Sequence, residues 1–147
     1  MGIMRSFQGK IIFIDTAPLI YYIEGHSEWQ SKLMEIFTKN HEGELPIITS
    51  TLTLLELLVQ PLKLKRFDLV EKYEQILTSS PHIEIIELDI EIAKKAAEFR
   101  STFNLKTPDS IQIATAVLNS AEIFLTNDKD LQRVKNHIEV ITLTDIV

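Results

Sequence analysis

Five short apolar runs alternate along the chain with longer segments of helical character, and this alternation constrains the fold more than any other feature. Each run is rich in β-branched residues, as expected of strands that are buried on both faces of a sheet. Strands that alternate with helices form βα units, which build a parallel sheet covered by helices on both faces. The fold class is therefore predicted to be α/β, with three layers in the order α/β/α and a central parallel sheet of four to five strands. The runs are KIIFIDT (10–16), PIITS (46–50), IEIIEL (83–88), EIFLT (122–126) and IEVITL (138–143).

Helices are predicted between these strands from their composition and from the residues at their ends. Proline is favourable in a first turn but stops a helix elsewhere, so the helix that starts at Thr51 is expected to end before Pro61. Thr107 is expected to be the N-cap of a later helix, with Pro108 as its first helical residue. The other predicted helices are Pro18 to Glu24, Trp29 to about Asn40, Phe67 to Ser79, Ile90 to Phe103 and a short helix in DKDLQRVKN (128–136).

The size and composition of the chain favour one domain over residues 1–147. At 147 residues and 45% hydrophobic content, the chain is long enough to bury one core. Cysteine is absent, which excludes disulfides, cysteine-ligated zinc and thiolate nucleophiles. No apolar run is long enough to span a membrane, so a cytoplasmic location is expected. The net charge of -6 argues against a protein that coats nucleic acid, but not against a nuclease whose acidic site holds phosphate through cations.

Two aspartates follow predicted strands. Asp15 ends the first strand and Asp128 comes just after the fourth. The carboxyl ends of parallel strands meet at one rim of the sheet, and ligand sites form there at the point where the strand order reverses. If the two strands are neighbours, Asp15 and Asp128 share a crevice. The simpler alternative is that each caps a helix, because Asp is a preferred N-cap residue.

Two further acids, Glu56 and Asp109, lie in predicted helices. Glu56 interrupts the apolar run LTLLELLV (52–59), where a buried ionised carboxylate is costly. Alternatively, Thr53, Glu56 and Gln60 form a modest solvent-exposed stripe at helical spacing. Asp109 lies in the first turn of a largely apolar helix, where an acid interacts favourably with the helix dipole. That structural role does not exclude metal binding.

Four acids without a matching cluster of Lys or Arg suit a hard cation such as Mg²⁺ or Mn²⁺. Other chemistries are poorly supported, because the sequence contains no dinucleotide-binding or P-loop glycine motif, no nucleophile elbow and no zinc-protease motif. The histidines are scattered over predicted loops. A phosphatase is also disfavoured, since Asp15 is followed by Thr16 and Ala17 rather than by a second acid two residues on.

Four segments together resemble the PIN-domain ribonucleases, and in particular the VapC-like toxin halves of bacterial and archaeal toxin–antitoxin pairs. They occur in the order and approximate spacing of that family and extend over nearly the whole chain. The most specific part is the third segment followed by the fourth. The segments are FIDTAPLIYYIEG (13–25), TLTLLELL (51–58), LKTPDSIQIATA (105–116) and FLTNDKDL (124–131).

The resemblance implies a PIN-like fold and a metal-dependent endoribonuclease that cuts RNA phosphodiester bonds. It assigns catalysis and the binding of one or two Mg²⁺ or Mn²⁺ ions to four acids, and a supporting role to two polar neighbours of the last acid. Asp130 falls where the family varies and is interpreted as a cap or surface charge. The acids are Asp15, Glu56, Asp109 and Asp128, and the supporting residues are Thr126 and Asn127.

The resemblance also implies partners, namely an RNA substrate, a small antitoxin protein and a second copy of the chain in a homodimer. Apolar residues in the early helices add to the case for a dimer, because they exceed what one small core would hide; the alternative is that they are ordinary core. The leading rival function is a non-catalytic PIN-like domain that binds RNA or a protein. The apolar residues are Leu19, Tyr21, Tyr22 and Trp29.

Overall fold

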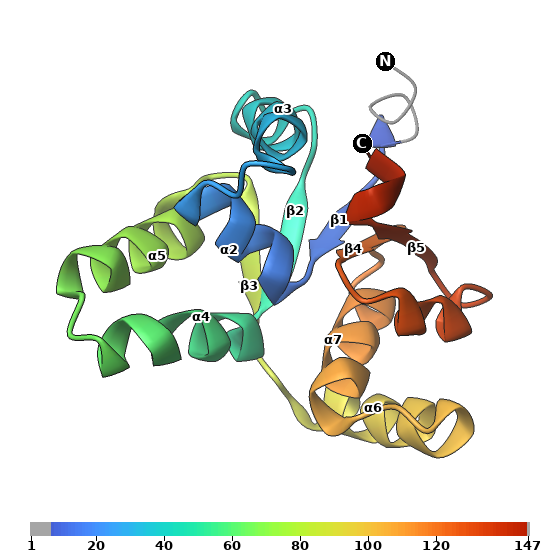
Figure 1. The fold of residues 1–147 in the computed structure, drawn as a ribbon. Helices are drawn as coiled ribbons and strands as arrows, with labels where there is room; N and C mark the ends of the chain where they lie inside the picture. Colours follow the sequence, from blue (N-terminus) through green and yellow to red (C-terminus); the bar gives the residue numbers. More distant parts are fainter. Residues whose placement is uncertain (1–6, 147) are drawn as a thin grey trace.

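Five parallel strands form one sheet in the computed structural model, which describes residues 7–146 (Figure 1). The order across the sheet is β3-β2-β1-β4-β5. The predicted α/β fold with a parallel sheet is therefore confirmed. The predicted single domain over residues 1–147 also includes residues 1–6 and 147, which lie outside the described part. The strands are β1 (Ile12–Ile14), β2 (Ile47–Ser50), β3 (Ile83–Ile86), β4 (Ile123–Thr126) and β5 (Glu139–Thr142).

Two hydrophobic cores lie on opposite faces of this sheet. In β1, Ile12 and Ile14 belong to one core and Phe13 to the other, as the alternation of side chains along a strand requires. Figure 1 shows the helices in two groups around the sheet. The first core is covered by α2 (Thr16–Glu24), α3 (Gln30–His41), α4 (Thr51–Lys63), α5 (Phe67–Ser79) and the 3-10 helix η2 (Leu143–Ile146). The second is covered by α6 (Ile90–Phe103), α7 (Thr107–Leu118) and the 3-10 helix η1 (Lys129–Val134).

The prediction that Pro61 ends its helix is wrong, because α4 continues to Lys63. Pro61 lies in the last turn, where its missing N–H removes one hydrogen bond only shortly before the helix ends. Its ring is buried, and its carbonyl oxygen accepts a hydrogen bond from the Arg66 backbone N–H at 2.8 Å. Packing and this hydrogen bond offset the local cost of the proline.

The predicted cap of α7 is also corrected. Lys106, not Thr107, is the N-cap residue, and it makes no capping hydrogen bond with its side chain. The Ser110 backbone N–H donates to the Lys106 carbonyl at 3.0 Å, so the first helical hydrogen bond already reaches Lys106. Thr107 is therefore the first helical residue and Pro108 the second. This places Asp109 at the third helical position.

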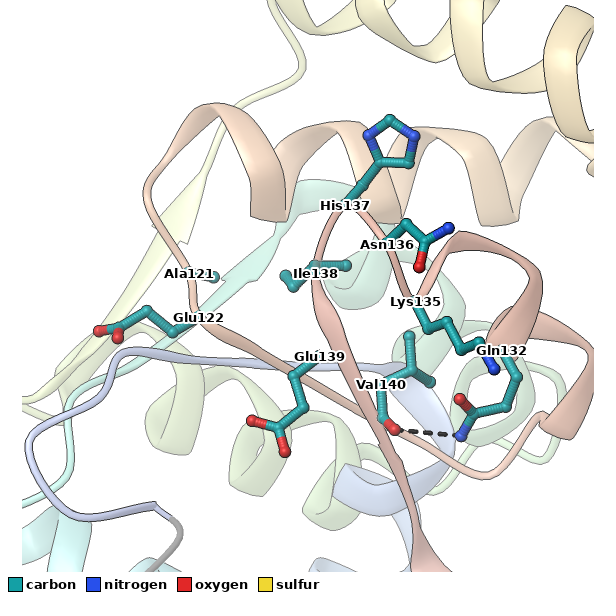
Figure 2. Close-up of a pocket in the computed structure, with 9 residues that line it drawn as sticks. All are labelled: Ala121, Glu122, Gln132, Lys135, Asn136, His137, Ile138, Glu139 and Val140. Atoms are coloured by element: carbon teal, nitrogen blue, oxygen red, sulfur yellow. Dashed lines mark hydrogen bonds between the residues drawn. The ribbon is translucent and has the colours of Figure 1, made fainter.

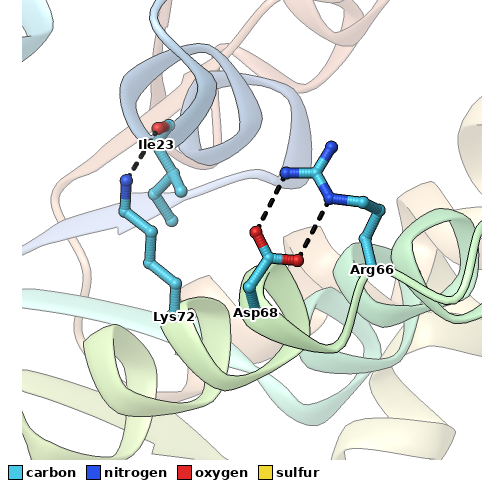
Figure 3. A network of polar contacts seen from close by, with 4 residues as sticks. All are labelled: Ile23, Arg66, Asp68 and Lys72. Atoms are coloured by element: carbon cyan, nitrogen blue, oxygen red, sulfur yellow. Dashed lines mark hydrogen bonds and ion pairs between the residues drawn. The ribbon is translucent and has the colours of Figure 1, made fainter.

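One local and one long-range polar contact hold the first turns of α5 in place (Figure 3). The Arg66 guanidinium donates two hydrogen bonds to the Asp68 carboxylate, at 3.1 and 3.0 Å. Lys72 Nζ reaches the Ile23 carbonyl at the end of α2, at 3.5 Å. Because Arg66 and Asp68 are both exposed, solvent screens their ion pair and it contributes little to stability. Within residues 7–146, no helix has the length and apolar character needed to cross a membrane.

Candidate active site

The strand order reverses beside β1, since the chain places β2 and β3 on one side of it and β4 and β5 on the other. Ile14 of β1 lies opposite Leu125 of β4, and the Asp15 backbone N–H donates to the Leu125 carbonyl at 2.9 Å. Asp15 and Asp128 therefore follow neighbouring parallel strands at one rim. In α/β sheets this reversal point is where ligands bind.

Three donors hold the Asp15 carboxylate in place. Oδ1 accepts from the Thr16 backbone N–H at 2.9 Å and from Gln112 Nε2 at 3.3 Å, and Oδ2 accepts from Thr126 Oγ1 at 2.8 Å. The first of these bonds makes Asp15 the N-cap of α2, so the capping interpretation also holds. Burial raises the pKa of Asp15; the hydrogen bonds from Thr126, Thr16 and Gln112 oppose this rise, and the charge of Glu56 adds to it.

Glu56 is half-buried on α4 and turns toward the same rim. Its Oε1 accepts a hydrogen bond from Thr16 Oγ1 at 2.7 Å, so the residue after Asp15 holds Glu56. The alternative of a solvent stripe does not describe this face well, because Thr53 is fully buried and only Gln60 is exposed.

The charges of the other three acids affect the pKa of Asp109. Burial is the main reason why its pKa is raised, and the carboxylates of Asp15, Asp128 and Glu56 raise it further. Lys106 acts in the opposite direction. The helix α7 therefore places Asp109 near enough to the carboxylates that follow β1 and β4, and to the one on α4, for their charges to raise its pKa.

Asp128 is the N-cap of η1, and its Oδ1 accepts from the Asp130 backbone N–H at 2.9 Å. The Asp128 backbone N–H donates to Thr126 Oγ1 at 3.1 Å, and the Thr126 hydroxyl in turn donates to Asp15. Thr126 thus connects the two aspartates. Asn127 is exposed and donates to the Tyr21 hydroxyl at 3.3 Å; within the described residues it makes no hydrogen bond to any of the four acids.

Sequence reasoning missed a buried polar network behind the acids. Gln112 is only 2% exposed and bonds to Asp15, Thr53 and Ser50. A signal for it was present in the sequence, since Gln112 follows Asp109 by three residues and so lies on the same face of an otherwise apolar helix.

The four acids offer the oxygen ligands that Mg²⁺ and Mn²⁺ prefer. No Lys or Arg in the described part of the chain forms an ion pair with any of them. Between residues 7 and 146, however, no three His, Cys, Asp or Glu side chains are gathered closely enough to hold one ion as they stand. The raised pKa of Asp15 and of Asp109 reflects burial first and repulsion second, and a bound cation would offset the cost of both. The four carboxylates therefore suit a hard cation in their chemistry, although the described side chains do not already surround one binding position.

A shallow hollow of about 740 Å³ lies at the opposite end of the sheet (Figure 2). The hollow is lined by Glu122, which precedes β4, and by Glu139, the first residue of β5. Gln132 and Lys135 also line it. Gln132 Nε2 donates to the Val140 carbonyl at 3.1 Å. Because Asp15 and Asp128 follow the carboxyl ends of their strands, this hollow at the opposite end of the sheet is separate from the candidate site.

Solved structures of similar fold cover most of the chain. A toxin–antitoxin complex from Klebsiella pneumoniae contains a chain that is 25% identical, with 90% of this chain and 97% of that chain covered and a TM-score of 0.68. VapBC2 from Rickettsia felis, bound to a DNA fragment from its promoter, is 21% identical, with coverage of 90% and 98% and a TM-score of 0.69. VapC20 from Mycobacterium tuberculosis, a toxin that cleaves the sarcin-ricin loop, is 14% identical, with coverage of 88% and 98% and a TM-score of 0.69. At these identities, the last two show the fold alone.

The sequence itself matches one family model. A comparison with curated proteins gave no match. The model of the PIN domain matches residues 12–136, from the start of β1 to just beyond η1, and this range includes all four acids. The chain therefore belongs to the PIN domain family.

Proposed function

We propose that this protein is a divalent-metal-dependent endoribonuclease that hydrolyses RNA phosphodiester bonds, and that it is the toxin of a type II toxin–antitoxin pair acting in the cytoplasm. The observation that supports catalysis best is that four half-buried acids lie on segments that meet near the reversal point of the sheet. Burial raises the pKa of Asp109, and the charges of the other three acids raise it further. PIN family membership and the likeness to toxin chains support the same proposal.

In this proposal, Asp15, Asp109 and Asp128 hold the cation, and Glu56 contacts it directly or through water. When bound, Mg²⁺ or Mn²⁺ activates water for attack on a phosphodiester and stabilises charge on the phosphoryl oxygens. Thr126 orients Asp15 and Asp128 together, and Thr16 orients Asp15 and Glu56. Hydrolysis by water needs no RNA 2′-hydroxyl as nucleophile, so preference for RNA must come from the shape of the strand, from its being single-stranded or from the exclusion of competitors.

The rival function is a PIN domain that binds RNA or a protein without cutting. Such a domain has no use for acids that repel one another and resist ionisation, as Asp109 does here. A cleavage assay on mixed RNA with Mn²⁺ separates the two functions.

Ribonuclease activity is expected to require Mg²⁺ or Mn²⁺, because every proposed ligand is a hard carboxylate oxygen. Excess chelator should abolish cleavage, measured on a gel with total RNA, and added Mn²⁺ should restore it. The restoration step is the control for irreversible damage. Full activity in excess chelator would end the metal hypothesis.

A homodimer and a small antitoxin partner are also proposed. The early apolar residues do not support the dimer, because Leu19 and Trp29 are buried and Tyr21 and Tyr22 pack against the core. Support comes instead from the relatives solved as toxin–antitoxin complexes and from large apolar side chains that are exposed on α4, on the loop after it and at the start of α5. These side chains are Leu55, Val59, Leu62, Leu64 and Phe67.

Light scattering on the purified chain is expected to give the mass of a dimer. A monomer at high protein concentration would contradict the dimer, and the absence of a small neighbouring reading frame in the genome would count against the antitoxin.

A further inference from the structure

Gln112 occupies the centre of the polar network behind the four acids. It lies on α7, one turn after Asp109, and its side chain is buried. We infer that Gln112 is a positioning residue for the proposed metal centre, because its amide ties together the three segments that carry Asp15, Glu56 and Asp109. This inference rests on the proposed function and assigns a role to a residue outside the acidic set.

The orientation of the Gln112 amide follows from its neighbours. Nε2 donates to Thr53 Oγ1 at 2.7 Å and to Asp15 Oδ1 at 3.3 Å. An ionised carboxylate can only accept, so the nitrogen must face Asp15. Oε1 accepts from the Ser50 hydroxyl, whose oxygen is itself the acceptor for the Thr53 backbone N–H at 3.2 Å. Both amide hydrogens and the carbonyl oxygen are therefore in use, and the amide cannot flip without losing these contacts.

The network continues from Gln112 to Glu56. Thr53 Oγ1, which accepts from Gln112, lies 3.5 Å from Thr16 Oγ1. The Thr16 hydroxyl has a single proton and donates it to Glu56 Oε1. Gln112 thus touches Asp15 directly and reaches Glu56 through two threonines. Ser50 and Thr53 lie at the start of α4, so the same amide also fixes the helix that carries Glu56.

Thr115, the next buried polar residue on this face of α7, is an example of a purely structural role. Thr115 is 1% exposed, and its hydroxyl donates to the Ile111 carbonyl of its own helix at 2.7 Å. Thr115 makes no hydrogen bond to any of the four acids within residues 7–146, so Thr115→Val is a matched control for a buried polar change on α7.

The test replaces Gln112 by Met, which has similar length but no hydrogen-bonding amide. Asp15 would lose one of its three donors, and the loss of a partner behind a metal ligand costs about 10–100-fold in metal affinity or activity. The Mn²⁺ concentration that gives half of the maximal thermal stabilisation should therefore rise about tenfold or more. At low Mn²⁺, kcat should fall while the KM for RNA stays unchanged. Thr115→Val should lower the melting temperature without moving the Mn²⁺ midpoint.

A second variant covers the case in which Gln112→Met does not fold. Gln112→Asn keeps an amide but ends one methylene short, so it should show the same rise in the Mn²⁺ midpoint. A wild-type midpoint in a folded Gln112 variant overturns the inference. If the wild-type protein itself fails to cleave RNA with Mn²⁺, the proposed function is wrong, and the Mn²⁺ midpoint from thermal melting still decides the role of Gln112.

Discussion

Replacing Asp109 by Asn is expected to abolish RNA cleavage while leaving the metal-free protein at pH 7 as stable as the wild type or more stable. Activity should fall by at least about a hundredfold, because even the loss of an outer partner of a metal ligand costs about 10–100-fold. The stability result follows from charge. Asn removes the cost of burying the Asp109 charge and relieves its repulsion from Asp15, Asp128 and Glu56. It loses only a favourable dipole interaction of about 0.3–1 kcal/mol at the start of α7.

The pH dependence of this effect has a definite sign. Burial and the three neighbouring carboxylates raise the folded-state pKa of Asp109 above its ordinary value of 3.8. Below the unfolded pKa both states are protonated, so the acid costs no stability. As the pH rises from the unfolded pKa to the raised folded pKa, the unfolded state releases its proton while the native state still holds it, so the native state is increasingly destabilised. The advantage of Asp109→Asn over the wild type should therefore be larger at pH 7 than at a pH below the ordinary value of 3.8, measured by thermal melting in chelator.

Two other substitutions sharpen this experiment. Asp130→Asn changes an exposed acid close to Asp128, and it should leave both cleavage and Mn²⁺ stabilisation at wild-type levels. Asp15→Asn should also abolish cleavage but lower the melting temperature. Both carboxylate oxygens of Asp15 accept hydrogen bonds, from three donors in all, and the amide nitrogen of Asn cannot accept where it replaces one of these oxygens. If Asp109→Asn retains wild-type Mn²⁺ stabilisation and still cleaves RNA, Asp109 is only a helix-terminal acid.

Phe13→Ala is expected to destabilise the protein by about 3–5 kcal/mol, the usual cost of truncating a buried aromatic residue. Phe13 lies on the central strand β1, is fully buried, and stacks on Phe124 of β4 with ring centroids 5.0 Å apart. Truncation would leave a cavity between β1, β4 and the helix α7. A loss of this size is a large part of the 5–15 kcal/mol that typically separates folded and unfolded domains.

Urea unfolding followed by the fluorescence of Trp29, the single tryptophan, measures this loss. Phe13→Leu is the control, since it keeps most of the apolar volume and should cost clearly less. A loss for Phe13→Ala no larger than the roughly 0.5 kcal/mol of a surface substitution would contradict the packing described for this face of the sheet.

Local pattern was enough to predict the five strands and most of the helices, although α2 begins at Thr16 rather than Pro18 and η2 was not predicted. The run IIFI before Asp15 has the β-branched composition of a buried strand, and the structure contains β1 at that place. The helices at Phe67–Ser79 and Ile90–Phe103 begin and end where their composition indicated. Helix and strand formation are decided mainly by neighbours along the chain, through backbone hydrogen bonds and side-chain periodicity, so the sequence carries this information directly. The boundary at Pro61 was wrong because burial and a hydrogen bond from Arg66 offset a local penalty.

The sequence by itself therefore determined the parallel α/β fold and the positions of the four acids at strand ends and in helices. Only the tertiary structure decided that β1 and β4 are neighbours, which brings Asp15 and Asp128 to one rim. It also decided that Gln112 reaches across to Asp15, and that Asn127 turns away to Tyr21. These contacts join residues that are far apart in the chain, and such pairs form only when the packing of both cores has fixed the strand order and the helix positions. A local sequence pattern determines on which face of its own helix or strand a residue lies. Which residue of another element it contacts there depends on the packing of the whole fold.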